Sequence, residues 1–229
     1  METTQSNPGA AAPPSSGHRR FVGLAAWAGI AGPVLFTASF LTQEAFRRDE
    51  YDPVSEVVSA LEAGPNGWVQ QVTFVVFGAL TMVHAVGLHR GMAPSRAGLV
   101  GPAFLFLSGV GSVVAGMLPL REDAAGVTYD PGGHLVGGTL FFIATPVAFL
   151  FLARRMGRDR SWRALTPYAV VAGVALIVSA IVMNVLVIPD DAALHDQAGL
   201  IQRLIVLVLI FPLRVALGFR LLSRSRAPR

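Results

Sequence analysis

The chain has 229 residues, of which 53% are hydrophobic and 14% are charged, against about 25% charged residues in a typical soluble domain. It contains neither cysteine nor lysine, which excludes disulfides, thiolate metal ligands, cysteine nucleophiles and lysine Schiff bases. The net charge of +4 comes from arginines scattered in short loops with no basic face, so nucleic acid is not an expected partner. This composition is typical of an integral membrane protein.

Residues 1–20 are rich in proline, alanine, serine and glycine and poor in large apolar side chains. We expect them to form a disordered tail, because they have too little apolar surface to bury. The apolar run that follows is about 25 residues long, which exceeds the roughly 7–15 residues of a signal-peptide core. It therefore predicts a retained first membrane span.

Six apolar segments reach the roughly 20 residues that a helix needs to cross a hydrocarbon core of about 30 Å. They lie at 21–46, 68–89, 98–120, 132–153, 165–189 and 198–222. Their connections are short, so neighbouring helices are expected to run antiparallel. We predict that residues 21–222 form one all-α membrane domain, a bundle of six transmembrane helices, followed by a basic cytoplasmic tail at 223–229.

Arginine is distributed unevenly between the two sets of alternating loops. Thirteen arginines lie in the two tails, the second loop and the fourth loop, whereas the opposite loops hold three. Because cytoplasmic loops carry the excess of positive charge, we expect both termini in the cytoplasm of a multi-pass protein of the cell (plasma) membrane. The first, third and fifth loops then lie on the extracytoplasmic side.

The first of these loops, YDPVSEVVSALEAGPNGW at 51–68, combines polar residues with a helical pattern. Asp52 and Pro53 are typical of a helix start, and apolar residues recur at the i, i+3, i+4 and i+7 positions of one helix face. These residues are Val54, Val57, Val58 and Leu61. We predict an amphipathic α-helix of about three turns from Pro53 to Glu62, too short to span, which lies in the interface and caps the bundle.

Polar residues from other segments are predicted to reach the same end of the bundle. His134 opens the fourth span, and Gln202 and Arg203 lie in the first two turns of the last span, about 6–9 Å below its start. An intramembrane arginine usually has a partner inside the protein, so we expect Arg203 to pair with an acid of the capping helix. The candidate acids are Asp52, Glu56 and Glu62. The predicted polar pocket consists of Asp52, Ser55, Glu56, Ser59, His134, Gln202 and Arg203.

Other residues within the spans predict how the helices pack. Nearer the cytoplasmic side, we expect Arg214 to extend its guanidinium to the interface and His84 to have a packing role with satisfied nitrogens. Bends are expected at Pro33, Pro146 and Pro212. Small residues that would let helix backbones approach closely are Gly29, Gly32, Gly109, Gly111, Ala115, Gly116, Gly137 and Gly138.

No motif for catalysis or for metal or cofactor binding accompanies the polar residues. The histidines and carboxylates of the extracytoplasmic side lack metal-ligand spacing such as HExxH. Ser55 or Ser59 with His134 and an acid has the inventory of a hydrolase triad, but neither serine lies in a G-x-S-x-G elbow. Neither a phosphate-binding loop nor a dinucleotide fingerprint occurs. We therefore predict no metal, no cofactor and no catalytic residue.

The order of several short motifs resembles one family. The chain has YDPVS at 51–55, AGMLPLRED at 115–123, His134 at the start of the fourth span and GLIQRLIVLVLIF at 199–211. Together these resemble the DUF998 family of six-span integral membrane proteins. The resemblance implies that fold and topology over residues 21–222 and implies no activity. The positions that match its motifs are Asp52, Ser55, Ser59, His134, Gln202 and Arg203.

From these patterns we expect an integral membrane protein whose extracytoplasmic pocket binds a lipid headgroup or small amphiphile, with membrane lipid as partner. Three alternatives remain open. One is a membrane-embedded lipid hydrolase or transferase, with His134 as base and an acid from 52–62. Another is a small-molecule transporter, which the scarcity of ionisable residues at mid-span disfavours. The third is a structural or partner-binding subunit.

Overall fold

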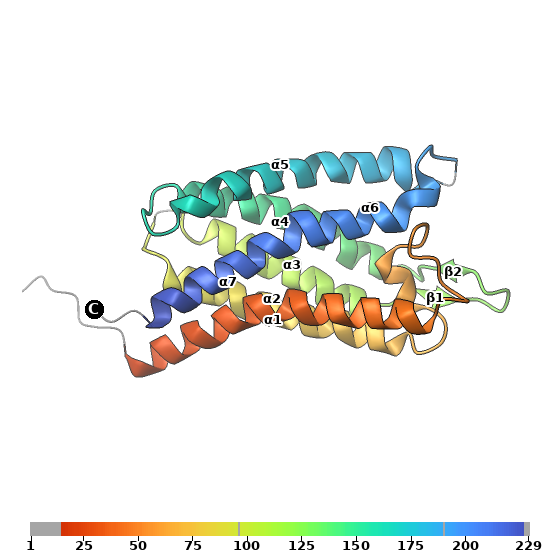
Figure 1. The fold of residues 1–229 in the computed structure, drawn as a ribbon, viewed down its shortest axis with the longest axis horizontal. Coiled ribbons are helices and arrows are strands. Elements are labelled where there is room, and N and C mark those ends of the chain that lie inside the picture. The colour runs from red at the N-terminus through yellow and green to blue at the C-terminus, as the bar shows by residue number, and fades with distance from the viewer. Residues whose placement is uncertain (1–14, 96, 190, 227–229) are drawn as a thin grey trace, which may run out of the picture.

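The computed structural model describes residues 15–95, 97–189 and 191–226, and most of these are helical (Figure 1). Six helical segments are long and apolar enough to cross a membrane. They are Ser16–Phe46, Trp68–Gly91, Val100–Met117, His134–Met156, Arg163–Val187 and His195–Arg226. The predicted all-α bundle of six transmembrane helices is therefore confirmed.

The first four spans are single α-helices. They are α1 (Ser16–Phe46), α2 (Trp68–Gly91), α3 (Val100–Met117) and α4 (His134–Met156). Helix α1 begins five residues before the predicted start of the first span at residue 21. Ser15 caps this earlier start by accepting from the backbone N–H of His18. Residues 1–14 of the predicted disordered tail lie outside the described residues.

The last two spans change helix type along their length. The fifth consists of η2 (Arg163–Leu165), α5 (Thr166–Val182) and the π-helical η3 (Met183–Val187). The sixth consists of η4 (His195–Gln197), α6 (Ala198–Leu204), the π-helical η5 (Ile205–Ile210) and α7 (Phe211–Arg226). Helix α7 thus continues into the predicted basic tail.

Proline explains the π-helical segment of the last span. Pro212 has no N–H, so the carbonyl of Val208, four residues earlier, lacks its α-helical donor. The hydroxyl of Tyr168 in α5 donates to this carbonyl. At Pro212, where the sequence predicts a bend, the helical hydrogen bonding therefore changes, and the bond from Tyr168 ties the fifth span to the sixth.

Helices α1 to α5 pack in sequence order, and α7 returns against α1. Glycine brings the central helices close together, as expected from their sequence. A Cβ on Gly109 of α3 would lie 2.7 Å from the carbonyl oxygen of Gly78 in α2. A Cβ on Gly111 would lie 2.6 Å from the carbonyl oxygen of Gly137 in α4. Side chains at these positions would force the helices apart, so α2, α3 and α4 form the most closely packed part of the bundle.

The two ends of the bundle differ. Figure 1 shows the start of α1 and the end of α7 at one end, which is rich in arginine, and the strands β1 (Arg121–Glu122) and β2 (Thr128–Tyr129) at the other. We call the latter the hairpin end, formed by residues 47–67 and 118–133. The antiparallel pair of strands was not predicted.

A short helix lies between the first two spans, as predicted, but it is the 3₁₀-helix η1 (Val58–Glu62). The predicted three-turn α-helix from Pro53 is wrong, because residues 53–56 form turns instead. The expected start does form: Asp52 accepts from the backbone N–H of Val54 at 3.0 Å. The helix does not continue from this start, and the reason lies in the last span.

The carbonyls that an α-helix would need are used to cap another helix. Val54 and Ser55 accept hydrogen bonds from the backbone N–H groups of Leu200 and Gly199, at 2.9 and 3.2 Å. These N–H groups belong to the first turn of α6 and have no partner within their own helix. The loop at 52–57 therefore caps the last span with its backbone.

Candidate functional site

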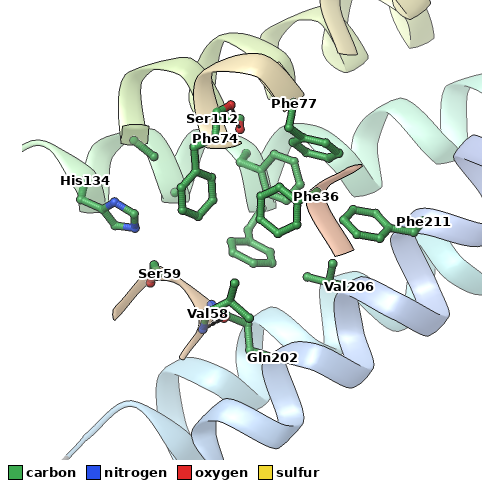
Figure 2. Close-up of a pocket in the computed structure, with 14 residues that line it drawn as sticks. Phe36, Val58, Ser59, Phe74, Phe77, Ser112, His134, Gln202, Val206 and Phe211 are labelled. Atoms are coloured by element: carbon green, nitrogen blue, oxygen red, sulfur yellow. Dashed lines mark hydrogen bonds between the residues drawn. The ribbon is translucent and has the colours of Figure 1, made fainter. Parts of the chain in front are cut away.

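A cavity of about 60 Å³ lies inside the bundle near the hairpin end (Figure 2). Six phenylalanines contribute most of its apolar wall. They are Phe36, Phe74, Phe77, Phe141, Phe142 and Phe211. Ser59 and His134 lie together at one end of the cavity in Figure 2, and Gln202 lies further along its wall. The cavity is therefore apolar over most of its length and polar on the side of the loop.

Phe36 of α1 is at the centre of the aromatic wall. Its ring centroid lies 5.2 Å from that of Phe74, 4.9 Å from that of Phe77 and 5.7 Å from that of Phe211. Tilted and edge-on contacts at these separations are favourable beyond the area that they bury. Because these rings come from α1, α2 and α7, the wall links three spans.

His134 is held at the polar end by a buried acid. Its Nδ1 lies 2.7 Å from Oε2 of Glu62, whose side chain is 0% exposed. The two atoms are close without being aligned as a hydrogen bond. The same carboxylate oxygen accepts from the backbone N–H of Leu120 at 3.2 Å. With Nδ1 turned to Glu62, Nε2 is the nitrogen that His134 can offer to a molecule in the cavity.

Gln202 has a defined orientation. Its Oε1 accepts from the backbone N–H of Val58 at 2.7 Å, which fixes which end of the amide is oxygen. Its amino group therefore remains to donate elsewhere, and the residue lines the cavity. Ser112 also lines the cavity, but its hydroxyl is used, since it donates to the carbonyl of Phe74 at 2.8 Å.

Arg203 belongs to a separate network. Its Nε and Nη2 donate to one carboxylate oxygen of Glu44 at 2.9 and 2.6 Å, and its Nη1 donates to the backbone carbonyl of Glu56 at 2.9 Å. The prediction that an acid of the capping helix pairs with Arg203 is wrong. The acid instead comes from the last turn of α1, where sequence reasoning treated residues 21–46 as one apolar span.

Tyr51 completes this network. Its hydroxyl accepts from Nη2 of Arg203 at 2.5 Å and lies 3.0 Å from the backbone carbonyls of Glu56 and Val57. Burial raises the pKa of Tyr51 to about 12, while the nearby guanidinium acts in the opposite direction. The hydroxyl therefore stays protonated at neutral pH. Protein groups occupy all three nitrogens of Arg203, so this residue holds the loop against the last span and offers nothing to the cavity.

The seven residues of the predicted pocket therefore fall into two groups. Those that line the cavity are Ser59, His134 and Gln202. Those that lie elsewhere are Asp52, Ser55, Glu56 and Arg203. Asp52 is exposed and accepts from the hydroxyl of Ser55 at 2.8 Å. The N–H of Val54 and then this hydroxyl hold the pKa of Asp52 below its usual value.

Glu62 was not among the predicted pocket residues. It was named as a candidate partner for Arg203 and, within 52–62, fell among the acids of the hydrolase alternative. The sequence spacing gives a partial signal for the burial of Glu62. Ser59 and Glu62 are three residues apart, so the 3₁₀-helix η1 places both side chains on the same, buried side. Nothing in the sequence indicated that Glu62 would meet His134 from the start of α4.

Arg214 and His84 lie toward the arginine-rich end. Arg214 is 1% exposed, donates to the hydroxyl of Thr81 and places its guanidinium 4.4 Å above the ring of Phe77. The prediction that it extends to the interface is therefore wrong. His84 is fully buried, and its Nδ1 lies 2.9 Å from the carbonyl of Ala25. Its Nε2 has no hydrogen-bond partner among the described residues, so the prediction that both nitrogens are satisfied is wrong. Phe77 thus separates Arg214 from the cavity.

The described residues contain no group of three or more histidine, aspartate or glutamate side chains that could hold a metal ion. What the cavity offers is an apolar wall, one imidazole backed by a carboxylate, one hydroxyl and one amide. Such a set can bury an apolar group and hydrogen-bond a polar one, and it can move a proton between an oxygen and a nitrogen.

The sequence matches a protein-family model. Residues 30–218 match the family described as "Protein of unknown function (DUF998)". No curated protein and no solved structure matches the chain. The matched region begins within α1, ends within α7 and contains every residue that lines the cavity. The chain therefore belongs to the DUF998 family.

Proposed function

We propose that the protein binds an amphiphilic molecule of the bilayer, with an apolar chain between the phenylalanines and a polar group beside Ser59, His134 and Gln202. The segregation of the cavity lining carries this proposal, because Ser59, His134 and Gln202 gather toward the loop and aromatic rings form most of the rest. Ser112, the other polar residue of the lining, has its hydroxyl bonded to the carbonyl of Phe74. Sites for small molecules commonly combine such an apolar wall with a few polar groups that fix orientation.

The volume limits what the cavity holds. A cavity of about 60 Å³ takes a short apolar segment and is too small for a whole lipid tail. Each buried CH₂ group contributes about 0.8 kcal/mol, so even a few carbons give useful affinity. The rest of the ligand then stays in the bilayer beside the helices.

We place the hairpin end on the extracytoplasmic side of the cell membrane, with both termini in the cytoplasm. The support is the excess of arginine in the tails and in the second and fourth loops. The ligand would therefore come from the outer leaflet.

Cross-linking with a photoactivatable fatty acid that carries a diazirine on its chain tests the proposal. Gly138 lines the cavity, and a Cβ built on it has no atom within 4 Å, so Gly138→Leu is designed to occupy the space with no clash at its Cβ. Thr139→Leu is the matched control, because the neighbouring Thr139 is exposed. We expect adducts on the peptides that contain the six phenylalanines.

Gly138→Leu should reduce these adducts by about tenfold, the equivalent of about 1.4 kcal/mol, whereas Thr139→Leu should leave them unchanged. Equal labelling of both variants, or adducts confined to the lipid-facing side of α5, would contradict binding in the cavity. Thermal melting of each variant shows that the fold is intact.

A further inference from the structure

We propose that the cavity is also a site of acyl-ester hydrolysis, with Ser59 as nucleophile, His134 as general base and Glu62 as the residue that positions His134. This inference rests on the proposed function, because it takes the bound amphiphile to be a lipid with an ester-linked acyl chain. Water is the second substrate.

The contact between Glu62 and His134 is the first observation. A carboxylate that is 0% exposed lies 2.7 Å from Nδ1 of an imidazole that is 13% exposed, and the backbone N–H of Leu120 holds the same oxygen. The other carboxylate oxygen, Oε1, is buried without a hydrogen-bond partner among the described residues. Removing such a pair from water costs free energy, and apolar residues often stabilise a fold equally well. Its place at the polar end of a cavity is typical of a functional group.

The position of Ser59 is the second observation. Ser59 and Glu62 are three residues apart in η1, which has about three residues per turn, so both lie on one side of this helix. Ser59 lines the same end of the cavity as His134, and Figure 2 shows the two residues near each other with no hydrogen bond drawn between them. The hydroxyl turns about a single bond and joins the imidazole when substrate is bound, as in other sites whose catalytic hydrogen bonds tighten only in the complex.

Gln202 supplies the third element. An acyl transfer builds negative charge on the carbonyl oxygen, and a fixed donor aimed at that oxygen lowers the barrier. Since the Oε1 of Gln202 accepts from the N–H of Val58, the donor that this cavity-lining residue can supply is its amino group, which has no hydrogen bond among the described residues. The same hydrogen bond keeps the amide from turning.

The reaction balances with these groups alone. Oγ of Ser59 forms a bond to the acyl carbon as its proton passes to Nε2 of His134, and the carbonyl electron pair moves onto oxygen beside Gln202. The bond to the alkoxy group then breaks, and the alcohol leaves with the proton from His134. Water adds to the acyl-serine in the same way, its proton passes through His134 to Ser59, and the carboxylic acid is released. Glu62 stabilises the imidazolium at each transfer.

An alkyl fluorophosphonate, which bonds covalently to an activated serine with loss of fluoride, tests this proposal on the full-length protein in lipid nanodiscs. We expect one adduct, mapped by peptide mass spectrometry to Ser59. Ser59→Ala should abolish it, and Ser55→Ala should not, because Ser55 lies on the same loop but bonds Asp52 outside the cavity. Mapping the adduct in the unmodified protein needs no variant to fold.

The positioning role of Glu62 has its own test. Glu62→Gln keeps the shape but favours the wrong imidazole tautomer, so labelling of Ser59 should slow by about 100-fold or more. Glu62→Asp keeps the charge and should recover part of the rate at a similar melting temperature, which a purely structural role does not predict. Gln202→Glu keeps the acceptor for Val58 but removes the donor, so it should slow the reaction as well.

The two proposals fail in different ways. If the photoactivatable fatty acid enters the cavity while Ser59 stays unlabelled, hydrolysis is wrong and binding stands. If the fatty acid does not enter, the binding proposal is wrong and the hydrolysis proposal falls with it. Hydrolysis of p-nitrophenyl octanoate that is lost in Ser59→Ala and retained in Ser55→Ala supports both.

Discussion

Two buried ionic clusters lie at the hairpin end, and they differ in what they leave unused. In the Arg203 cluster, the guanidinium meets Glu44, Tyr51 and a backbone carbonyl, and it does not line the phenylalanine-lined cavity. In the Glu62 cluster, His134 lines the cavity and one carboxylate oxygen has no partner among the described residues. A charge inside a membrane therefore does not itself mark a site. The first cluster holds the loop against the last span, and the second is the one that we propose contacts a ligand.

The largest effect that separates the two clusters is expected for Arg203→Ala. The change leaves Glu44 without its partner, and breaking a buried pair in this way costs about 3–5 kcal/mol. Thermal melting in nanodiscs should show this loss. Protein that remains folded should still label in the cavity, because Arg203 does not line it. A variant that melts normally but no longer takes up the fatty acid would contradict the division into two clusters.

A second, smaller effect is expected where the loop docks on the last span. A Cβ on Gly199 would lie 2.2 Å from the carbonyl oxygen of Glu56 and 2.7 Å from that of Pro53. Because both contacts are backbone atoms, Gly199→Ala should displace the loop and destabilise the fold by about 1–3 kcal/mol. Gly138→Ala, where there is open space, is the control. Equal melting of the two variants would show that the loop is not docked as described.

Acid pH is expected to destabilise the protein through Asp130, which lies four residues before His134. Burial would raise the pKa of Asp130, but hydrogen bonds from the backbone N–H groups of residues 132–135 together lower it. A pKa that is lower in the folded state stabilises the protein above the unfolded value of about 3.9, and this contribution is lost as pH falls through the folded value. The melting temperature should therefore drop at acid pH, and Asp130→Asn should show a smaller drop. An identical acid response in both proteins would show that the hydrogen bonds to Asp130 do not stabilise the fold.

The smallest effect is expected for Arg214→Met. Arg214 donates to Thr81 and packs on Phe77, and among the described residues it forms no ion pair. Replacing a buried charge by an apolar side chain of similar volume is often neutral or stabilising. The free energy of unfolding, followed by thermal melting, should change by less than about 1 kcal/mol for Arg214→Met and by far more for Arg203→Met. Equal losses would mean that the partner acid does not explain the difference between these arginines.

The spans were predictable because a backbone that crosses lipid must satisfy its own hydrogen bonds, so long apolar runs have to be helical. The close approach at Gly109 and Gly111 was predictable for a similar reason, since small residues allow helices to pack without a hydrophobic driving force. Both predictions depend on local composition alone.

The partners of the polar residues were not predictable from local patterns. Depth in the membrane indicated that Arg203 needs an acid but not that α1 supplies Glu44. The pattern at 53–62 fits an α-helix, yet the first turn of α6 takes the carbonyls of Val54 and Ser55. The pairing of Glu62 with His134 depends on how the loop lies across α4, which only the folded chain defines.

Native mass spectrometry of the protein released directly from its membrane is the sharpest test of lipid binding in the cavity. We expect one tightly held lipid or other amphiphile on the unmodified protein and on Thr139→Leu, and none on Gly138→Leu. The same adduct on all three proteins, at the same occupancy, would show that the molecule binds outside the phenylalanine-lined cavity and that the proposed function is wrong.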